Sequence, residues 1–265
     1  WVLFVNDWAN GADFTGYILN AGQKPFKFPP PDGFQPLNAA NTRPVNVISR
    51  PDQYVGVATY VGNGDPNSNT QTVRGLNFGD KPDFVWIKQR SSTAQNHALF
   101  DSIRGPGHNL SSSTNHAERS DHSGSTGDLM SFDVNGFTVG SSAASGARPV
   151  NLNGKDIVAW CWKAGGDKNT FNIDDVGYAT TTAAGLTAGD VAPTGASVGT
   201  KQGFSIIRWT APTWSGSPQQ VPHGLTQSPS FIIAKVINDA ASWYCYHKDL
   251  DASNPQNKYL SLIHI

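Results

Sequence analysis

The chain is organised around one apolar run, Pro82-Asp83-Phe84-Val85-Trp86-Ile87-Lys88. β-Branched and aromatic residues dominate the run, a proline opens it and the polar residues 89–96 follow it, which together predict a buried strand. The same Pro-x-Phe-apolar-apolar-x-Lys pattern returns 147 positions later, as Pro229-Ser230-Phe231-Ile232-Ile233-Ala234-Lys235. We therefore expect the chain to contain two copies of one β module.

The flanks of the two runs match as well. Residues 54–60 precede the first run as residues 204–210 precede the second, and residues 97–101 follow the first as residues 243–247 follow the second. A repeat of this length indicates a duplicated domain and not a unit of a solenoid. We expect the second copy to be cut off before its end.

Composition limits the classes of function. The net charge is −1, so we expect neither nucleic acid nor an anionic membrane surface as a partner. Only 15% of the residues are charged, while 27 Gly, 17 Pro and 8 Trp are present, and this profile is typical of an extracellular or virion β protein with polar, uncharged surfaces. No stretch approaches the roughly 20 apolar residues of a membrane helix, so we expect no membrane insertion.

The start of the chain does not have the form of a signal peptide. Met130 is the only methionine, so Trp1 is not a translation start and we expect a processed product or a fragment. Of the two cysteines, Cys161 and Cys245 each lie between aromatic residues. Two buried free thiols are the simpler expectation, and a disulfide between domains is the alternative.

Many short strands, frequent turn signals and the absence of a helical period predict an all-β protein of tandem antiparallel jelly-roll sandwiches. The expected segments are a C-terminal remnant of a β domain (1–40), a linker (41–52), a complete β-sandwich module (53–165), a Gly/Ala/Thr-rich linker (166–200) and the truncated second copy (201–265). Strands of the complete module are expected at 53–61, 70–78, 83–89, 97–101, 129–133, 136–140 and 156–163.

The clearest hairpin covers Phe132–Val139. Its Asn135-Gly136 pair suits both positive-φ positions of a two-residue type I′ turn. Between strands we expect long polar loops, above all residues 102–128. A loop of that length exceeds what packing requires, and such loops are usually functional or mobile.

Two resemblances add to this interpretation. Residues 14–38, with Gly22-Gln23-Lys24-Pro25-Phe26 and Pro30-Pro31-Asp32-Gly33-Phe34, resemble the last strand and exit of a SPRY-type domain. Residues 53–165 resemble a repeat of marine bacteriophage structural proteins, including those of phages of cyanobacteria. The matching pieces are Tyr60-Val61-Gly62-Asn63-Gly64, Lys81-Pro82-Asp83-Phe84-Val85-Trp86-Ile87-Lys88, Leu99-Phe100-Asp101-Ser102-Ile103-Arg104-Gly105, Asn135-Gly136-Phe137-Thr138-Val139-Gly140 and Val158-Ala159-Trp160-Cys161-Trp162-Lys163-Ala164-Gly165-Gly166.

The resemblance implies a concanavalin-like jelly roll on a virion surface, in a tail fibre or a capsid appendage. Other virion proteins or copies of the chain itself are the implied partners. The resemblance supplies no catalytic residues, and with only the end of a SPRY-type domain present it does not carry over the peptide binding of such domains.

Ligand binding is the most credible chemistry in the sequence. Sugars stack on aromatic faces and bond to planar polar side chains, and Trp209, Trp214 and Gln219 supply both kinds of group, so host-surface glycans are the candidate ligand. The alternative places Trp209 in the core and Trp214 against a loop. Asp101 and Arg104, between a strand and the long loop, form either a structural ion pair or a ligand clamp.

We expect no cofactor and no metal. Three histidines of the long loop, His108, His116 and His122, lie with Glu118 and Asp121, but their spacing lacks the close pairs that zinc sites favour. We interpret them as solvated loop residues.

A calcium site is the second metal candidate. Residues 65–69 begin like a calcium-binding loop, yet Thr70 and Leu76 stand where such a loop needs Gly and Glu, so an EF-hand is excluded and a looser site remains the alternative.

A non-enzymatic function is expected, because the 20 acidic residues are scattered and no Gly-x-Ser-x-Gly motif is present. A glycan depolymerase is one alternative, and it requires two acids about 5–10 Å apart in a groove. A filament or capsid decoration subunit without a ligand is the other alternative, in which neighbouring copies supply missing strands.

Overall fold

The run around Phe84 forms a central strand of an antiparallel sheet. The computed structural model describes residues 48, 50–64, 70–91, 95–120, 122–123, 126–140, 150–213 and 216–261, which belong to one compact unit, Ile48–Ile265. Strand β3 (Phe84–Gln89) buries every second side chain, from Val85 to Gln89, while the residues between are half-buried. This alternation is the period of a strand with one face toward a core.

The sheet that contains β3, here called the first sheet, has the order β1-β11-β3-β4 with all neighbours antiparallel. Its other strands are β1 (Val55–Val61), β11 (Asp156–Trp162) and β4 (Ala98–Asp101). The central strand β11 is hydrogen-bonded to both β1 and β3, although it comes last in the sequence. The first sheet is therefore completed only by a strand from far along the chain.

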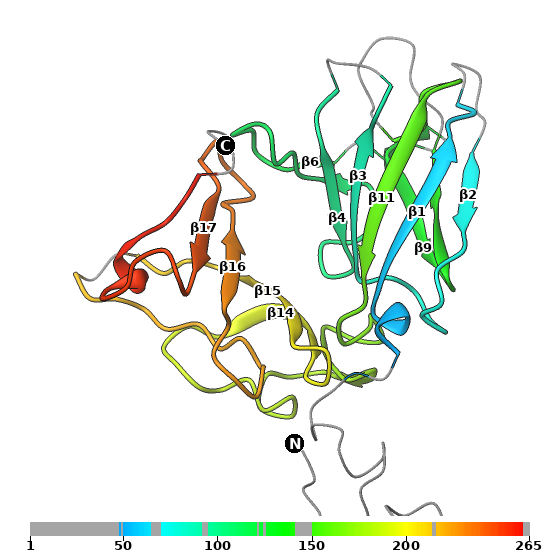
Figure 1. Ribbon diagram of the computed structural model, residues 1–265. Coiled ribbons are helices and arrows are strands. Elements are labelled where there is room, and N and C mark those ends of the chain that lie inside the picture. Colours follow the sequence, from blue (N-terminus) through cyan, green and yellow to red (C-terminus); the bar gives the residue numbers. More distant parts are fainter. Residues whose placement is uncertain are drawn as a thin grey trace, which may run out of the picture. The chain divides into compact units, whose positions relative to one another are not determined.

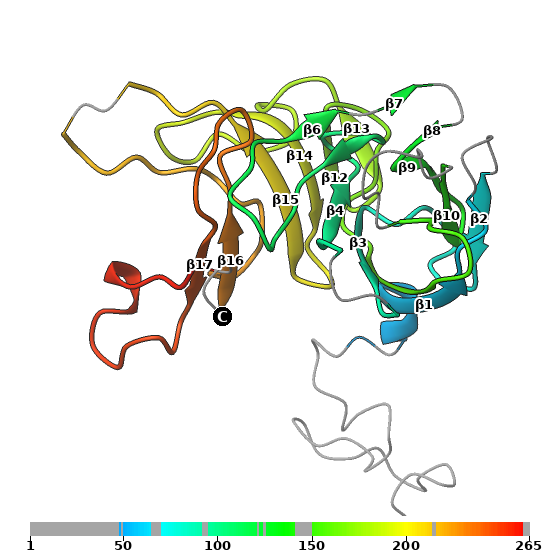
Figure 2. The ribbon, with the colours of Figure 1, turned by 90° about the horizontal axis from the view of Figure 1, so that it is seen from above.

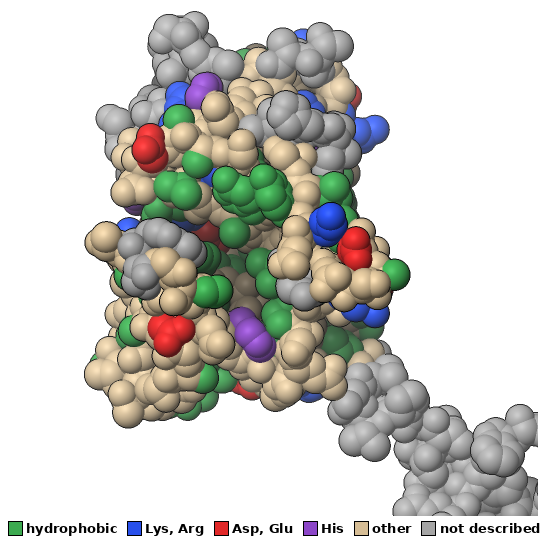
Figure 3. All heavy atoms as spheres, turned by 90° about the vertical axis from the view of Figure 1, so that its left-hand side faces the viewer, with side chains coloured by type: hydrophobic (Ala, Val, Ile, Leu, Met, Phe, Trp, Pro, Cys, Tyr) green, Lys and Arg blue, Asp and Glu red, His purple; other side chains and the backbone are tan. Residues whose placement is uncertain are grey.

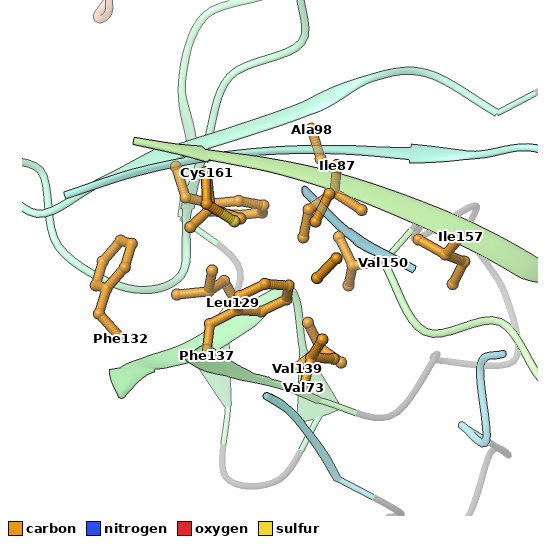
Figure 4. Packing of buried hydrophobic residues seen from close by; sticks show 14 of the residues in the cluster. Val73, Ile87, Ala98, Leu129, Phe132, Phe137, Val139, Val150, Ile157 and Cys161 are labelled. Carbon is orange, nitrogen blue, oxygen red and sulfur yellow. The ribbon is translucent and has the colours of Figure 1, made fainter. Parts of the chain in front are cut away.

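A second sheet of order β2-β10-β9 faces the first (Figure 1). It consists of β2 (Gln71–Arg74), β10 (Gly136–Val139) and β9 (Leu129–Asp133). Ile87 and Cys161 from the first sheet meet Leu129 and Phe137 from the second, and all four are fully buried (Figure 4). The fold is all-β, as expected, and this part of it is a β-sandwich. All seven strands expected within residues 53–165 are present.

The β9–β10 hairpin is confirmed, but its turn differs from the expected one. Asp133 pairs with Gly136, so the two loop residues are Val134 and Asn135, and only Asn135 of the expected Asn-Gly pair has a positive φ, of 57°. Glycine is needed at position 136 for another reason. A Cβ atom there would lie 2.1 Å from the carbonyl oxygen of Val73 on the neighbouring strand β2.

Residues 166–200 do not form the expected linker. They contain β12 (Phe171–Ile173), β13 (Val176–Tyr178) and β14 (Pro193–Gly199), which join β15 (Phe204–Trp209) in a third sheet of order β13-β12-β14-β15. The low-complexity composition was misleading because β14 is buried along most of its length and uses small residues there. Its Val198 packs with Phe171 and Leu186 in a separate core.

The second copy of the Pro-x-Phe pattern forms a two-stranded sheet of β16 (Phe231–Ala234) and β17 (Tyr244–His247). This hairpin-like pair repeats the register of β3 and β4. In the first copy Phe84 pairs with Asp101, and in the second Phe231 pairs with His247. The two copies differ in the strand before this pair, because β15 pairs with β14 and not with a counterpart of β11.

The β16–β17 pair packs on the outer face of the first sheet through one apolar cluster. Trp243, with 3% of its surface exposed, lies against Leu99 and Leu110, with Ile233 and Trp86 around them. The indole nitrogen of Trp243 donates hydrogen bonds to the carbonyl oxygens of Ser111 and Thr114, at 2.9 and 3.1 Å. This cluster is where the two copies of the β pattern contact each other.

The segment 102–128 is less open than expected, because four two-residue strands lie within it. They are β5 (His108–Asn109), β6 (Arg119–Ser120), β7 (His122–Ser123) and β8 (Thr126–Gly127). The helical elements of the described residues are two 3-10 turns, η1 (Pro51–Gln53) and η2 (Pro255–Asn257). No helix in this part of the chain is long and apolar enough to cross a membrane.

Cys161 and Cys245 are free and buried, as the simpler expectation had it. Burial raises the pKa of the Cys161 thiol to about 12. The expected SPRY-like remnant at 1–40, most of the linker at 41–52 and the calcium-like residues 65–69 lie outside the described residues.

Candidate functional site

Trp209 lies at the end of β15, opposite Pro193 at the start of β14. Residues 204–207 of β15 are half-buried, while Arg208 and Trp209 are exposed. Trp209 has 40% of its surface exposed, so the alternative that placed this residue in the core is wrong. The strand thus holds a large aromatic residue in solvent at one end of the third sheet.

The segment around Gln219 returns to the same end of this sheet. The carbonyl oxygen of Gln220 accepts hydrogen bonds from the backbone N–H groups of Asp190 and Val191, at 2.9 and 3.0 Å. The Asp190 carboxylate in turn accepts a 3.0 Å hydrogen bond from the N–H of Gln220. These bonds place Gln220 beside residues 190–191, which lie just before Pro193, the residue that pairs with Trp209.

We call this group the Trp209 surface, and its residues are Trp209, Asp190, Gln219 and Gln220, all exposed. It combines an aromatic face with two planar amides and one carboxylate. Such a set stacks against a flat apolar ligand face and hydrogen-bonds to hydroxyl groups at the rim of that face. Of the expected binding residues, Trp209 and Gln219 are both exposed, while Trp214 lies outside the described residues.

Asp101 and Arg104 lie elsewhere and form a buried network. Arg104 Nε donates to Asp101 Oδ2 at 2.5 Å, Nη1 donates to Glu118 Oε1 at 3.0 Å, and Nη2 donates to the Leu99 carbonyl oxygen at 3.0 Å. Only 6% of the Arg104 side chain and 9% of the Asp101 side chain are exposed. The guanidinium group already donates hydrogen bonds to groups of the protein itself, which favours the structural ion pair over the ligand clamp.

The histidines of segment 102–128 are only partly brought together. His108 Nδ1 lies 3.1 Å from Glu118 Oε2, and Glu118 also contacts Arg104. Asp121 and the side chain of His122 lie outside the described residues. Within the part of the chain that the structure describes, no three His, Cys, Asp or Glu side chains gather in a way that would hold a metal ion.

Sequence reasoning missed a buried carboxylate, Asp83, which has 2% of its surface exposed. Its Oδ2 accepts hydrogen bonds from the N–H groups of Ala164 and Gly166, at 2.7 and 3.2 Å, and its Oδ1 accepts from the hydroxyls of Ser102 and Ser197, at 2.8 and 3.2 Å. Burial raises the pKa of Asp83 even though these donors oppose the shift. The signal was an aspartate inside an apolar strand run, where an unpaired charge is costly.

Near Asp83 lies a second cluster, in which two carboxylates form ion pairs with one ammonium group. Lys163 Nζ contacts Asp175 Oδ1 at 2.6 Å and Asp80 Oδ2 at 3.2 Å. Burial alone would lower the pKa of Lys163, but the two carboxylates outweigh burial and raise that pKa. For Asp80, burial is outweighed by the Lys81 N–H and by Lys163, so the pKa of Asp80 is lowered. The cluster is an ion-pair network at the junction of the first and third sheets.

Comparison with known proteins gives one finding about this chain as a whole. Residues 50–263 match a family model described as a domain of unknown function, DUF7483. No curated protein and no solved structure matches the chain.

Proposed function

The chain belongs to the DUF7483 family, whose domain spans both copies of the β pattern, and we propose that it is a non-enzymatic bacteriophage virion surface protein that adheres to host-surface glycans. Its place is a tail fibre or a capsid appendage, outside the cell, in contact with other virion proteins or with copies of itself. The Trp209 surface is the adhesive site.

The observation that carries this proposal is the exposure of Trp209 at the end of β15. A tryptophan with 40% of its surface in solvent, at the end of a strand whose first residues are packed, is positioned for contact with a ligand and not for core packing. The backbone bonds between Gln220 and residues 190–191 fix the polar groups at the same end of the sheet. The polar, weakly charged composition and the phage resemblance of residues 53–165 support the virion setting.

The carboxylates support a binding role over glycan cleavage. A depolymerase needs one carboxyl group that stays protonated and accessible beside a second, ionised one. Asp80 and Asp175 share Lys163, and the pKa of Asp80 is lowered, which holds that group ionised. Asp83 has the raised pKa of an acid, but it is buried under four hydrogen-bond donors. In this cluster the carboxyl group with the raised pKa, Asp83, is buried, and the more accessible Asp80 has a lowered pKa.

A glycan array followed by titration calorimetry tests the proposal. We expect binding to a subset of bacterial surface glycans, with an affinity that falls at least about tenfold in Trp209→Ala, since one stacked aromatic residue often carries this much binding energy. Tyr244→Ala is the matched control, because Tyr244 is an exposed aromatic residue on another strand, with 45% of its surface exposed. Binding to no glycan, or equal loss in both variants, would overturn the proposal.

A further inference from the structure

We propose that β1 is a self-association edge, through which two copies of the chain pair antiparallel about a twofold axis at Ala58. The pairing joins the two four-stranded first sheets into one continuous sheet. This inference rests on the part of the proposed function that includes contact between copies, and it names the surface for that contact. It does not depend on glycan adhesion, because Trp209 belongs to β15 of the third sheet.

β1 is one of the two edge strands of the first sheet, and the two edges differ. At the other edge all four residues of β4 are buried, and Leu99 exchanges backbone hydrogen bonds with Leu110 at 2.8 and 3.1 Å. β1 pairs with β11 alone among the described residues. Figure 2 shows β1 at the margin of the sandwich, on the side away from β16 and β17. Within the described chain, the first sheet therefore has one covered edge and one open edge.

The open edge of β1 presents the backbone groups of every second residue. The Lys163 N–H donates to the Tyr54 carbonyl oxygen at 2.8 Å, and the Gly62 N–H donates to the Lys155 carbonyl oxygen at 2.9 Å. Because bonding alternates along an antiparallel strand, the even-numbered residues of β1 point their backbone groups toward β11. The residues that point theirs outward are Val55, Val57, Thr59 and Val61.

One of these outward groups has a partner within the described residues. The Val61 carbonyl oxygen accepts a 3.1 Å hydrogen bond from Gln71 Nε2, and a carbonyl oxygen keeps a second lone pair for another donor. For the outward backbone groups of Val55, Val57 and Thr59, the described part of the chain supplies no acceptor or donor. The middle of the edge is therefore open to a further strand.

The side chains of the outward residues are exposed and β-branched. Val55, Val57 and Val61 have 47%, 58% and 55% of their surface exposed, and Thr59 is exposed as well. β-Branched residues favour strands and form favourable pairs across neighbouring strands. Charged residues and prolines, which usually protect an exposed edge, do not occur in β1. The edge thus has the features of a strand that pairs with another chain.

The sequence of β1 selects a second copy as the partner. The strand has seven residues, so its centre is a residue, Ala58, and not a peptide bond. A twofold axis at Ala58 therefore pairs outward-pointing residues only with outward-pointing residues, as an antiparallel ladder requires. Val57 then lies opposite Thr59 of the second copy, and Val55 lies opposite Val61. Both pairs are β-branched, so the outward face of the strand is complementary to itself.

The residues of β1 that face the core suit the same axis. They form the closely spaced pairs of the ladder, with about 4.5 Å between Cα atoms. Ala58, which is small, meets Ala58 of the second copy, and Tyr60 lies opposite Gly56, which has no side chain. The Tyr60 hydroxyl already donates a 2.6 Å hydrogen bond to the Val150 carbonyl oxygen. No two large side chains meet at the close approach.

The outward valines also extend an apolar row that ends in an existing interface. Val57 pairs with Trp160, Trp160 pairs with Trp86, and Trp86 pairs with Leu99. The rings of Trp86 and Trp160 are 6.4 Å apart between centroids. Leu99 packs with Trp243 in the cluster where the two copies of the β pattern meet. Pairing through β1 continues this row into the second molecule.

A different area of exposed hydrophobic side chains lies on the face that carries β16 and β17 (Figure 3). Charged side chains stand among the hydrophobic ones on that face, and the exposed Lys248 and Asp249 directly follow β17. Charges of this kind discourage pairing of strand edges. Since β1 lacks them, we place the self-association on β1.

Sedimentation velocity of the full chain from about 1 to about 100 µM tests the association, because this range covers the dissociation constants of small interfaces. We expect the wild type to change from monomer to dimer. Val57→Lys places a charge on the open edge and should raise the dissociation constant at least about tenfold. Val176→Lys is the matched control, because Val176 is 52% exposed on β13, an edge strand of the third sheet, and it should leave the constant unchanged.

Two further measurements locate the contact. The backbone amides of Val57 and Thr59 should gain protection from hydrogen exchange as the protein concentration rises, while those of β4 should not change. A mixture of Val57→Cys and Thr59→Cys chains should form more disulfide-linked dimer than either variant alone, because the axis places these positions opposite each other. The native cysteines, Cys161 and Cys245, are buried and do not compete.

Four results would overturn the inference. The first is a monomer over the whole concentration range, and the second is equal weakening by Val57→Lys and Val176→Lys. The third is protection of the Val57 and Thr59 amides in the dilute monomer, which would show that the chain covers this edge itself. The fourth is stronger cross-linking of a single cysteine variant, which would exclude the axis at Ala58.

The two proposals can fail separately. Trp209→Ala should leave the dissociation constant of the dimer unchanged, and Val57→Lys should leave glycan binding unchanged. A change of self-association in Trp209→Ala would also contradict the placement of the contact on β1.

Discussion

The Asp83 carboxylate accepts a 3.2 Å hydrogen bond from the hydroxyl of Ser197, a residue 114 positions away. Asp83 immediately precedes β3, and Ser197 belongs to β14 in the third sheet. The one proton of this hydroxyl is shared with the Gly166 carbonyl oxygen, 2.9 Å away, and the hydroxyl oxygen accepts a bond from the Gly165 N–H at 2.9 Å. Ser197 therefore joins the sandwich, the segment after β11 and the third sheet at one point.

Replacing this hydroxyl should destabilise the whole unit. Ser197 is fully buried, so Ser197→Ala leaves the Gly165 N–H without its acceptor and removes one donor from Asp83. We expect the free energy of unfolding to fall by roughly 1–3 kcal/mol, measured by urea denaturation. Ser205→Ala, on the neighbouring strand β15, is the control and should change stability by less than about 0.5 kcal/mol. Equal effects of the two variants would contradict the role given to Ser197.

Asp83 should also make stability depend on pH in an unusual direction. Its pKa in the folded state is raised above the ordinary value of 3.8, mainly by burial, so the folded state holds the proton more tightly than the unfolded state. The contribution of Asp83 is therefore fully present below pH 3.8 and is lost as pH rises through the raised pKa.

Urea denaturation of the wild type and of Asp83→Asn at several pH values between about 4 and 7 measures this effect. The difference in unfolding free energy, wild type minus variant, should decrease as pH rises. A difference that grows with pH for Asp83→Asn would show that the carboxylate form is the better accommodated one.

The buried Arg104 network should be sensitive to loss of its cation. Arg104→Ala removes the guanidinium group that Asp101 and Glu118 share. We expect the free energy of unfolding to fall by about 3 kcal/mol, because the substitution leaves buried carboxylates without their cationic partner. Arg74→Ala, on the exposed side of β2, is the control. If Arg104 is structural, glycan binding of the folded variant stays at the wild-type level.

Replacing Trp243 should lower the free energy of unfolding much more than replacing Trp209. Trp243→Ala removes a side chain that is 97% buried by neighbours and hydrogen-bonded to Ser111 and Thr114, and it should cost about 3–5 kcal/mol. Trp209→Ala should cost about 1 kcal/mol or less, because its side chain is largely in solvent. Thermal unfolding of both variants checks the order. A larger loss for Trp209 would place it in the core after all.

Much of the sandwich could be predicted because its strands carry strong local signals. The runs that became β3 and β11 are short, apolar and rich in aromatic or β-branched residues, and the β9–β10 hairpin has a turn with the expected positive φ at Asn135. The repeat also predicted β16 and β17 correctly, since the Pro-x-Phe pattern encodes the same pairing twice.

The third sheet could not be predicted because its strands lack those signals. β14 contains Gly195, Ala196 and Ser197, residues that suit a linker when read locally. They are needed because the strand lies between β12 and β15 and against the sandwich, where little room is left for side chains. The Trp209 surface was found only in part for a similar reason, since Asp190 joins it through backbone bonds that no local pattern reveals.

The position of β11 has a consequence for synthesis on the ribosome. β1 and β3 emerge early, yet the strand that links them is β11, which begins only at Asp156. While the nascent chain is shorter than this, the two early strands have no partner between them and their edges can recruit other chains. We expect translation to pass through a window in which the sandwich is vulnerable to aggregation, and the window closes when Trp162 leaves the exit tunnel.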